Sequence, residues 1–192
     1  MEYIDVMMVR GDLEGIPHFE LPEPYRVRPY RPGDAETWRR IQAASDRFGT
    51  FPPGKFARVF GTDESVLAAR QLYLCDGEGE AIGTMSAWFG ESEEWRDWGR
   101  LHWVAVVPKH QGQGLARPLL TLTMNRLAEL GHARAFLGTA TPRLAAINLY
   151  LKFGFLPHVR SDEDIRAWRL AAPHLKAEYW DRAAARVPEL SA

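Results

Sequence analysis

The segment from residue 100 to residue 131 constrains the fold of this chain more than any other. It opens with the apolar run RLHWVAVV, passes through PKHQGQG, and continues as a leucine-rich stretch that stops at Gly131. The run is apolar on both sides, which predicts a strand in the middle of a sheet. Strict alternation would place Leu101, Trp103, Ala105 and Val107 on one face, and His102, Val104 and Val106 on the other. Leu115, Leu119 and Leu122 then recur with helical spacing, so a strand, a loop and a helix follow one another.

The loop between this strand and this helix has the features of an anion-binding site. A helix start carries unpaired N–H groups and a partial positive charge. Gly112 and Gly114 bring no Cβ atoms that would hold an anion away from the backbone. Lys109, His110 and Arg117 can add positive charge around it. The simpler alternative is a tight turn that uses glycine only for its backbone freedom.

The rest of the chain alternates between hairpin and crossover patterns. We expect further strands over residues 25–30, 70–76, 80–89, 133–140 and 164–171, and helices over 35–47, 54–60, 142–153 and 174–186. Asp34 and Thr141 are placed to cap two of these helices. This order predicts an α/β fold with one mixed sheet, mostly antiparallel with a parallel part, flanked by helices. Residues 1–24 are rich in proline and glycine, and we expect them to form an arm that drapes over a single domain of residues 25–192.

Composition excludes several classes of function. The 192 residues carry 24 Lys and Arg against 25 Asp and Glu, so no basic surface points to nucleic acid or to a membrane. No apolar run approaches the ~20 residues of a membrane helix, and the N-terminus lacks a signal-peptide pattern. The single cysteine, Cys75, cannot form an internal disulfide or a cysteine-based metal cage. We therefore expect a cytoplasmic protein without a metal.

Two common phosphate-binding patterns do not fit. A dinucleotide fingerprint needs a small residue where Arg117 stands, and no acidic residue ends a strand about 20 residues further on. The stretch GTFPPGKF at 49–56 has P-loop spacing, but Phe56 replaces the residue that would hold magnesium. Two prolines also remove N–H donors from that loop.

A third pattern does fit, and it appears twice in the expected order. The loop sequence QGQGLA at 111–116 resembles the Q/R-x-x-G-x-G/A motif of the GNAT superfamily of acyl-CoA-dependent N-acyltransferases. INLYLKFGF at 147–155 resembles the L-Y-x-x-x-G-F helix end of the same superfamily. The resemblance spans about residues 25 to 170 and includes the order of the elements. It implies a GNAT-like sheet in which a parallel pair of strands splays apart.

The resemblance also implies a binding site for acetyl-CoA. Backbone N–H groups of the loop would hold the pyrophosphate, the strand edge would pair with the pantetheine arm, and Asn148 would line the cofactor side of the later helix. The implied cofactor-binding residues are Val104, Ala105, Val106, Gln111, Gly112, Gln113, Gly114, Leu115, Ala116, Arg117 and Asn148.

Two side chains are candidates for the chemistry of amine acetylation. Tyr150 matches the superfamily's general-acid tyrosine, although its helical spacing with Leu149 and Phe153 also suits a core residue. His102 stands two residues before Val104, where a group titrating near ~6.5 could take the amine's proton. A structural histidine, with a glutamate or water as base, is the alternative. Cys75 lacks an activating neighbour, so we expect direct transfer without a covalent enzyme intermediate.

The acceptor is less constrained. Carboxylates and tryptophans in WFGESEEWRDWG at 88–99 could hold a cationic amine, or could simply form a solvated loop. Phe48 and Phe51 lie in a segment that resembles the usual acceptor wall. A small-molecule or peptide amine is the expected partner, and a homodimer is compatible with the sequence. The alternatives are a non-catalytic acyl-CoA sensor and a nucleotide-binding domain of another family.

Overall fold

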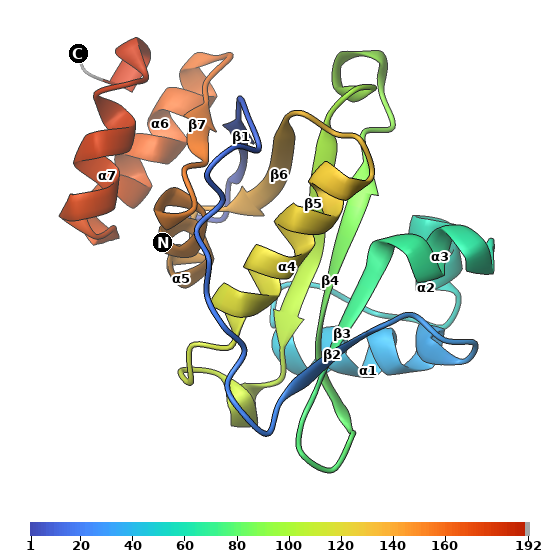
Figure 1. The fold of residues 1–192 in the computed structure, drawn as a ribbon. Coiled ribbons are helices and arrows are strands. Elements are labelled where there is room, and N and C mark those ends of the chain that lie inside the picture. Colours follow the sequence, from blue (N-terminus) through green and yellow to red (C-terminus); the bar gives the residue numbers. More distant parts are fainter. Residues whose placement is uncertain (191–192) are drawn as a thin grey trace.

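The computed structural model describes residues 1–190 as one seven-stranded sheet flanked by helices (Figure 1). The strands are β1 (Asp5–Arg10), β2 (Arg26–Pro29), β3 (Gln71–Cys75), β4 (Ala81–Phe89), β5 (Gly99–Val106), β6 (Ala135–Ala140) and β7 (Leu156–His158). The α-helices are α1 (Asp34–Ser45), α2 (Lys55–Phe60), α3 (Glu64–Arg70), α4 (Ala116–Glu129), α5 (Leu144–Lys152), α6 (Asp162–Ala171) and α7 (Ala177–Ala184). Short 3₁₀ turns are η1 (Glu93–Trp95), η2 (Pro108–His110), η3 (Ala172–His174) and η4 (Pro188–Leu190).

The sheet confirms the expected mixed, mostly antiparallel architecture. Its order is β2-β3-β4-β5-β6-β1-β7, and β5 stands at its centre. Only β5 and β6 run parallel, and they pair at two positions alone, Gly99 with Ala135 and Arg100 with Phe136. Beyond Arg100 the two strands diverge, so the predicted splayed pair is present.

The buried residues form two hydrophobic clusters, one between the sheet and the helices on each of its faces. One cluster gathers Leu119 and Met124 of α4 with Leu101 of β5. The other gathers Trp38 of α1 and Phe60 of α2 against Ala105. Figure 1 shows α4 crossing one face of β4 and β5, with α1 to α3 on the far side of those strands. None of the helices within residues 1–190 combines the length and apolar character needed to cross a bilayer.

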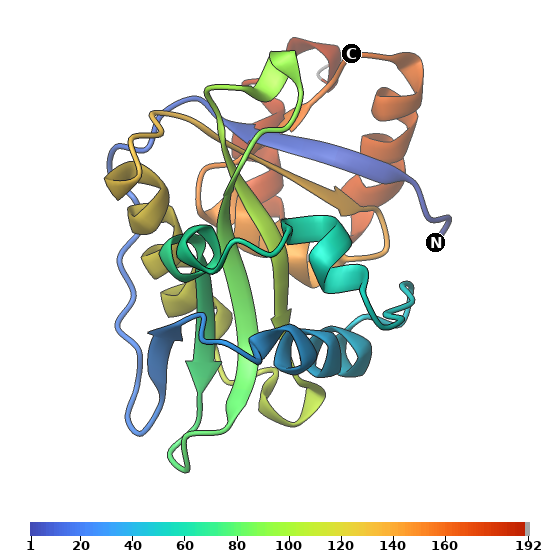
Figure 2. The same ribbon diagram turned by 90° about the vertical axis from the view of Figure 1, so that its right-hand side faces the viewer.

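The N-terminal segment differs from the expected arm. Residues 5–10 form β1, which lies between β6 and β7 and pairs antiparallel with both (Figure 2). Val6, Met8 and Arg10 alternate inward, and this period-two pattern is the sequence signal of a half-buried strand. After Arg10 the chain leaves the sheet. The Thr121 hydroxyl of α4 donates a 2.7 Å hydrogen bond to the Pro17 carbonyl in this segment.

The region that follows α5 was also predicted wrongly in part. Residues 164–171 lie in helix α6 rather than in a strand, because Ala167, Trp168 and Ala171 are buried with helical spacing and Ser161 caps the helix start. The last strand is instead the short β7. Helix α3, capped by Asp63, was not foreseen.

The two predicted helix caps have other partners. Asp34 is the first residue of α1, and its carboxylate accepts two hydrogen bonds from Arg28, at 2.6 and 2.8 Å. The Thr141 hydroxyl accepts a 3.1 Å hydrogen bond from the Ile4 N–H, and α5 begins only at Leu144. Both side chains therefore serve tertiary contacts instead of capping.

One predicted core position of α4 is exposed. Leu115, Leu119 and Leu127 are buried as expected, whereas Leu122 is 38% exposed. Met124 is fully buried on the side of α4 that it shares with Leu120 and Leu127.

Replacing Arg10 should destabilise the fold strongly. Arg10 is 8% exposed, and its guanidinium donates to the backbone carbonyls of Asp12, Glu14 and Phe153, which joins β1 to the end of α5. Arg10→Met keeps most of the volume but leaves buried carbonyls without donors, and we expect a loss of about 3 kcal/mol. For a chain of this length the melting temperature should fall by about 6–12 °C. An unchanged melting temperature would contradict this role.

Candidate active site

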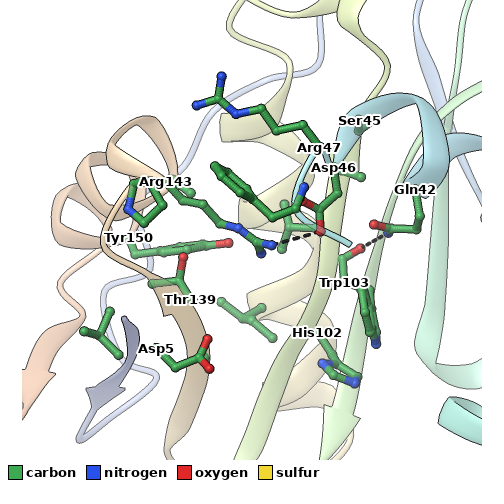
Figure 3. A pocket seen from close by; sticks show the side chains of 18 of the residues that line it. Asp5, Gln42, Ser45, Asp46, Arg47, His102, Trp103, Thr139, Arg143 and Tyr150 are labelled. Atoms are coloured by element: carbon green, nitrogen blue, oxygen red, sulfur yellow. Dashed lines mark hydrogen bonds and ion pairs between the residues drawn. The ribbon is translucent and has the colours of Figure 1, made fainter. Parts of the chain in front are cut away.

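A cavity of about 850 Å³ opens where β5 and β6 diverge (Figure 3). Its walls come from β1, the C-terminal end of α1, β5, β6 and the start of α5. The predicted residues His102, Val104, Ala105, Gln111 and Tyr150 all line it. The splay of the parallel pair thus creates a space of the size that a ligand and a second small molecule require.

A β-bulge in β5 shapes one wall of this cavity. The register with β4 shifts between Thr84 and Ser86, and Trp103 has a positive φ of 52°. The bulge inserts an extra residue, so strict alternation fails: Leu101 and Val104 join one hydrophobic cluster, whereas Trp103 joins the other. The prediction that Leu101 and Trp103 share a face is therefore wrong. The Gln42 side chain of α1 donates a 2.9 Å hydrogen bond to the Trp103 carbonyl and holds the bulge in place.

The bulge also leaves strand edge for a ligand. Neither Trp103 nor Val104 has a paired residue in β4 or β6 within the described chain. The Val106 carbonyl accepts a 2.7 Å hydrogen bond from the Gln111 side chain, which ties the glycine loop to the end of β5. Val106 and Leu115 bury their side chains in the core, so only their backbones could contact a ligand.

The glycine loop has the geometry of an anion site. Gly112 and Gly114 have φ of 75° and 79°, and a Cβ on either would meet no protein atom within 4 Å. Among residues 1–190, no acceptor receives the backbone N–H groups of residues 112 to 116. The Gln113 side chain accepts a 2.6 Å hydrogen bond from the Tyr25 hydroxyl, which fixes the outer part of the loop. Ala116 opens α4, and exposed Arg117 follows it in the first turn.

Tyr150 projects into the cavity from α5. Its residue is 6% exposed, and burial raises the pKa of its phenol to about 12, with nearby Arg143 opposing the shift. No group in the described part of the chain hydrogen-bonds to the Tyr150 hydroxyl. The phenol therefore stays protonated at neutral pH and has a free donor directed at the cavity.

His102 stands on the opposite wall, between Phe60 and Trp103 (ring centroids at 5.6 and 5.5 Å). Burial, and secondarily the Arg100 charge, lowers its pKa well below the usual value. At neutral pH its imidazole is therefore uncharged, and it is a weaker base than the sequence suggested.

The lowered pKa of His102 should make stability depend on pH. Folding favours the neutral form of the His102 imidazole, so its contribution to stability is fully present above the unfolded-state pKa of about 6.5. As pH falls below about 6.5 this contribution is lost, by up to about 1.4 kcal/mol per pH unit. His102→Gln should therefore lose less stability than wild type between pH 7 and pH 5 in chemical denaturation. The pKa of His132 is also lowered by burial, so His132→Gln provides a comparison for the remaining slope. Identical pH slopes for wild type and His102→Gln would contradict the assignment.

Asn148 does not lie in the cavity wall. Its side chain donates to the Leu144 carbonyl at 2.9 Å and accepts from the Lys176 N–H at 2.9 Å. Asn148 thus joins α5 to the segment before α7, and the implied cofactor contact is not supported by its position.

Of the expected acceptor groups, only Phe48 lines the cavity. Phe51 is buried in the core against Trp38 and Trp103. The loop at 88–99 packs against β6 through η1, where Trp95 stacks on Phe136 with ring centroids 4.4 Å apart. The carboxylates of this loop that were considered as amine ligands are all outside the cavity lining: Glu91, Glu93, Glu94 and Asp97.

Sequence reasoning missed the charged groups at the other end of the cavity. Asp46 and Arg143 form a 2.9 Å ion pair that joins the end of α1 to the start of α5. Asp5 reaches the same cavity from β1, below Tyr150 and Thr139 in Figure 3. Alternation in residues 4–10 was a signal for β1, but nothing local indicated that its first residue lines the same cavity as α1 and α5.

A mixed sheet whose single parallel pair opens beside a glycine-rich helix start defines an acyl-CoA-dependent acyltransferase fold. The chain belongs to the acetyltransferase (GNAT) family, whose sequence model matches residues 35–155. Acetyl-CoA is the acetyl donor of this family. The described residues contain no group of three or more His, Cys, Asp or Glu side chains that could hold a metal ion.

Curated relatives are similar over most of this chain. A mycothiol acetyltransferase of Geodermatophilus obscurus is 26% identical over 173 residues, which cover 80% of this chain and 52% of the relative. One from Streptomyces griseus subsp. griseus is 29% identical over 143 residues, 72% of this chain and 45% of the relative. This chain thus spans about half the length of these relatives.

Solved structures show the same fold. A GCN5-related N-acetyltransferase from Sphaerobacter thermophilus aligns with a TM-score of 0.61 at 23% identity, covering 81% of this chain and 50% of that chain. The ribosomal-protein-S18-alanine N-acetyltransferase from Escherichia coli aligns with a TM-score of 0.58 at 23% identity, covering 70% and 79%.

Proposed function

We propose that this protein is an N-acetyltransferase that moves an acetyl group from acetyl-CoA to an amine by direct attack. The observation that carries the proposal is the Tyr150 hydroxyl, a protonated donor without a protein partner in the cavity that opens beside the glycine loop. Family membership supports acetyl transfer in general, and the geometry of the cavity supports the amine and the tyrosine.

The glycine loop fits the diphosphate of coenzyme A. Backbone N–H groups of residues 112 to 116 and the start of α4 supply hydrogen bonds and a favourable dipole. The unpaired edge at Val104 then offers backbone groups to an amide-bearing arm, as in strand addition. Acetyl-CoA, when bound, would supply an acetyl thioester that is reactive toward an uncharged amine, and coenzyme A would leave as the thiol.

Tyr150 would hold a proton next to the leaving sulfur. Because its pKa is raised to about 12, the phenol remains a hydrogen-bond donor throughout the neutral range. A positioned acid of this kind contributes about 10²–10⁴-fold to a rate.

The amine loses a proton during the reaction, either to His102 or to water. His102 is neutral at pH 7 and has a nitrogen that can accept a proton, but its lowered pKa makes it a weak base. His102→Gln distinguishes the two routes, since only the first predicts a large fall in kcat.

Two measurements test the proposed function. Acetyl-CoA at a hundred times its Kd should add about 2.7 kcal/mol of stability, which is a rise in melting temperature of about 5–10 °C. A shift with NAD or ATP but none with acetyl-CoA would overturn the proposal. Thiol release from acetyl-CoA should then accelerate when small-molecule and peptide amines are added. If acetyl-CoA binds and no amine causes release, the protein is the non-catalytic acyl-CoA sensor instead.

A further inference from the structure

We infer that Asp5 of β1 binds the cationic nitrogen of the acceptor, and that the acceptor is therefore an alkylamine recognised in its protonated form. This inference rests on the proposed function and adds to it the group that selects the acceptor. Asp5 is held in a fixed position, its carboxylate has no partner within residues 1–190, and it lines the same cavity as Tyr150.

The backbone around Asp5 is held firmly although it lies near the N-terminus, where chains usually fray. The Thr141 N–H donates to the Ile4 carbonyl at 3.0 Å, and the Ile4 N–H donates to the Thr141 hydroxyl at 3.1 Å. Arg166 of α6 donates two hydrogen bonds to the Glu2 carboxylate, at 2.8 and 3.1 Å. Asp5 itself is paired with Ala140 in the sheet register. The side chain thus projects from an ordered strand.

The Asp5 carboxylate differs from its acidic neighbour in the cavity. Asp46 is only 15% exposed and is already neutralised by Arg143. In contrast, no cation or hydrogen-bond donor in residues 1–190 pairs with the Asp5 carboxylate. Asp5 is therefore the acidic group of this cavity that is available to a ligand.

Asp5 lines the same cavity as Tyr150 and His102. Three successive residues of β1, Asp5, Val6 and Met7, contribute to the cavity lining; Val6 is buried, whereas Asp5 is exposed. In Figure 3 the Asp5 carboxylate is on the β6 side together with Tyr150, opposite His102. An ammonium bound to Asp5 would therefore lie within the space that Tyr150 borders.

The chemistry of this arrangement favours a cation over a neutral ligand. An alkylamine at pH 7 is mostly protonated, and a charge-assisted hydrogen bond to a carboxylate is stronger than a hydrogen bond between neutral groups. The aromatic residues Tyr3 and Phe48, with ring centroids 5.2 Å apart at the cavity edge, add apolar surface for the carbon part of the acceptor. Three arginines line the cavity. Arg100 and Arg143 have carboxylate partners in Glu91 and Asp46, and the Arg47 guanidinium lies over the Phe48 ring, 4.8 Å from its centroid.

The test compares amines with alcohols of the same shape. Binding to the protein saturated with coenzyme A is measured by calorimetry for phenethylamine against phenethyl alcohol, glucosamine against glucose, and putrescine against butanediol. For at least one pair, wild type should bind the amine about tenfold or more tightly than the alcohol, the effect of one charge-assisted hydrogen bond. Asp5→Asn should remove that preference while the affinity for the alcohol stays the same.

A matched control is available on α7. Asp181→Asn also removes an exposed carboxylate, but Asp181 lies outside the cavity lining, so the amine preference should remain. The inference is overturned if wild type binds every amine and its alcohol equally, or if Asp5→Asn keeps the preference. Because the readout is binding without turnover, absence of thiol release would count against the proposed function and not against Asp5. An altered melting shift with acetyl-CoA in Asp5→Asn would show general damage, which would also remove the support for a specific role.

Discussion

Tyr150→Phe should lower kcat for amine acetylation by about 10²–10⁴-fold, the usual effect of removing a positioned general acid. The variant deletes one oxygen from a ring that is otherwise packed near Phe155, with ring centroids 6.1 Å apart. Since the hydroxyl has no partner within residues 1–190, its loss leaves no buried group unsatisfied. Stability and the melting shift with acetyl-CoA should therefore stay close to wild type. Thiol release under saturating acetyl-CoA is the measurement.

Tyr179→Phe is the matched control for this prediction. Tyr179 lies on α7, outside the cavity lining, and loses the same atom. Its kcat should equal that of wild type. If Tyr150→Phe keeps full kcat, the tyrosine is a core residue with an exposed tip, and the leaving sulfur takes its proton from water.

Gly114→Val should weaken acetyl-CoA binding by about 100-fold or more, because it fills the space in front of several backbone donors at once. Gly114 has φ of 79°, so a β-branched side chain there also costs about 1–2 kcal/mol of backbone strain. A Cβ at this position meets no protein atom within 4 Å, so the side chain would extend into the space that the diphosphate needs. Calorimetry or the concentration dependence of the melting shift gives the Kd.

Gly79→Val separates strain from blocked binding. Gly79 has φ of 86° in the hairpin between β3 and β4, and a Cβ there also meets nothing within 4 Å. Both variants should lose similar stability, but only Gly114→Val should lose affinity for acetyl-CoA. Equal Kd values for the two variants would mean that the main chain of the loop does not hold the diphosphate.

Local patterns in the sequence were sufficient to predict the strands and the helix at the centre of the fold. The unit from β5 to α4 was predicted because a strand that is apolar on both faces, a glycine pair and a leucine stripe are each local signals. The hairpin of β3 and β4 followed from the turn DGEG in the same way. The prediction of a strand over residues 164–171 was wrong although local signals for a helix were present: Ser161 caps the start of α6, and Ala167, Trp168 and Ala171 have helical spacing.

The predicted helix caps and the predicted alternation of β5 failed because of contacts that the local patterns do not show. Asp34 and Thr141 have the right chemistry to cap helices, but Arg28 and the backbone of Ile4 compete for their oxygen atoms. The bulge at Trp103 depends on a hydrogen bond from Gln42, about sixty positions earlier, so alternation alone could not reveal it.

The same distinction applies to the site. His102, Gln111 and Tyr150 were found because they belong to recognisable motifs, and all three line the cavity. Asp5, Asp46 and Arg143 lie at the ends of separate elements and meet only in the folded chain. For such residues the sequence shows the charge of the side chain and its position in the chain, but it does not show which residues lie beside it in the fold.

The place of β1 in the sheet has a consequence for biosynthesis. Ile4 makes its hydrogen bonds with Thr141, 137 positions later, so β1 leaves the ribosome well before β6 and β7, the strands with which it pairs. At about 5–20 residues per second that delay is on the order of ten seconds, during which the stretch VMMV stays uncovered. During this interval β1 is open to aggregation and to chaperone capture.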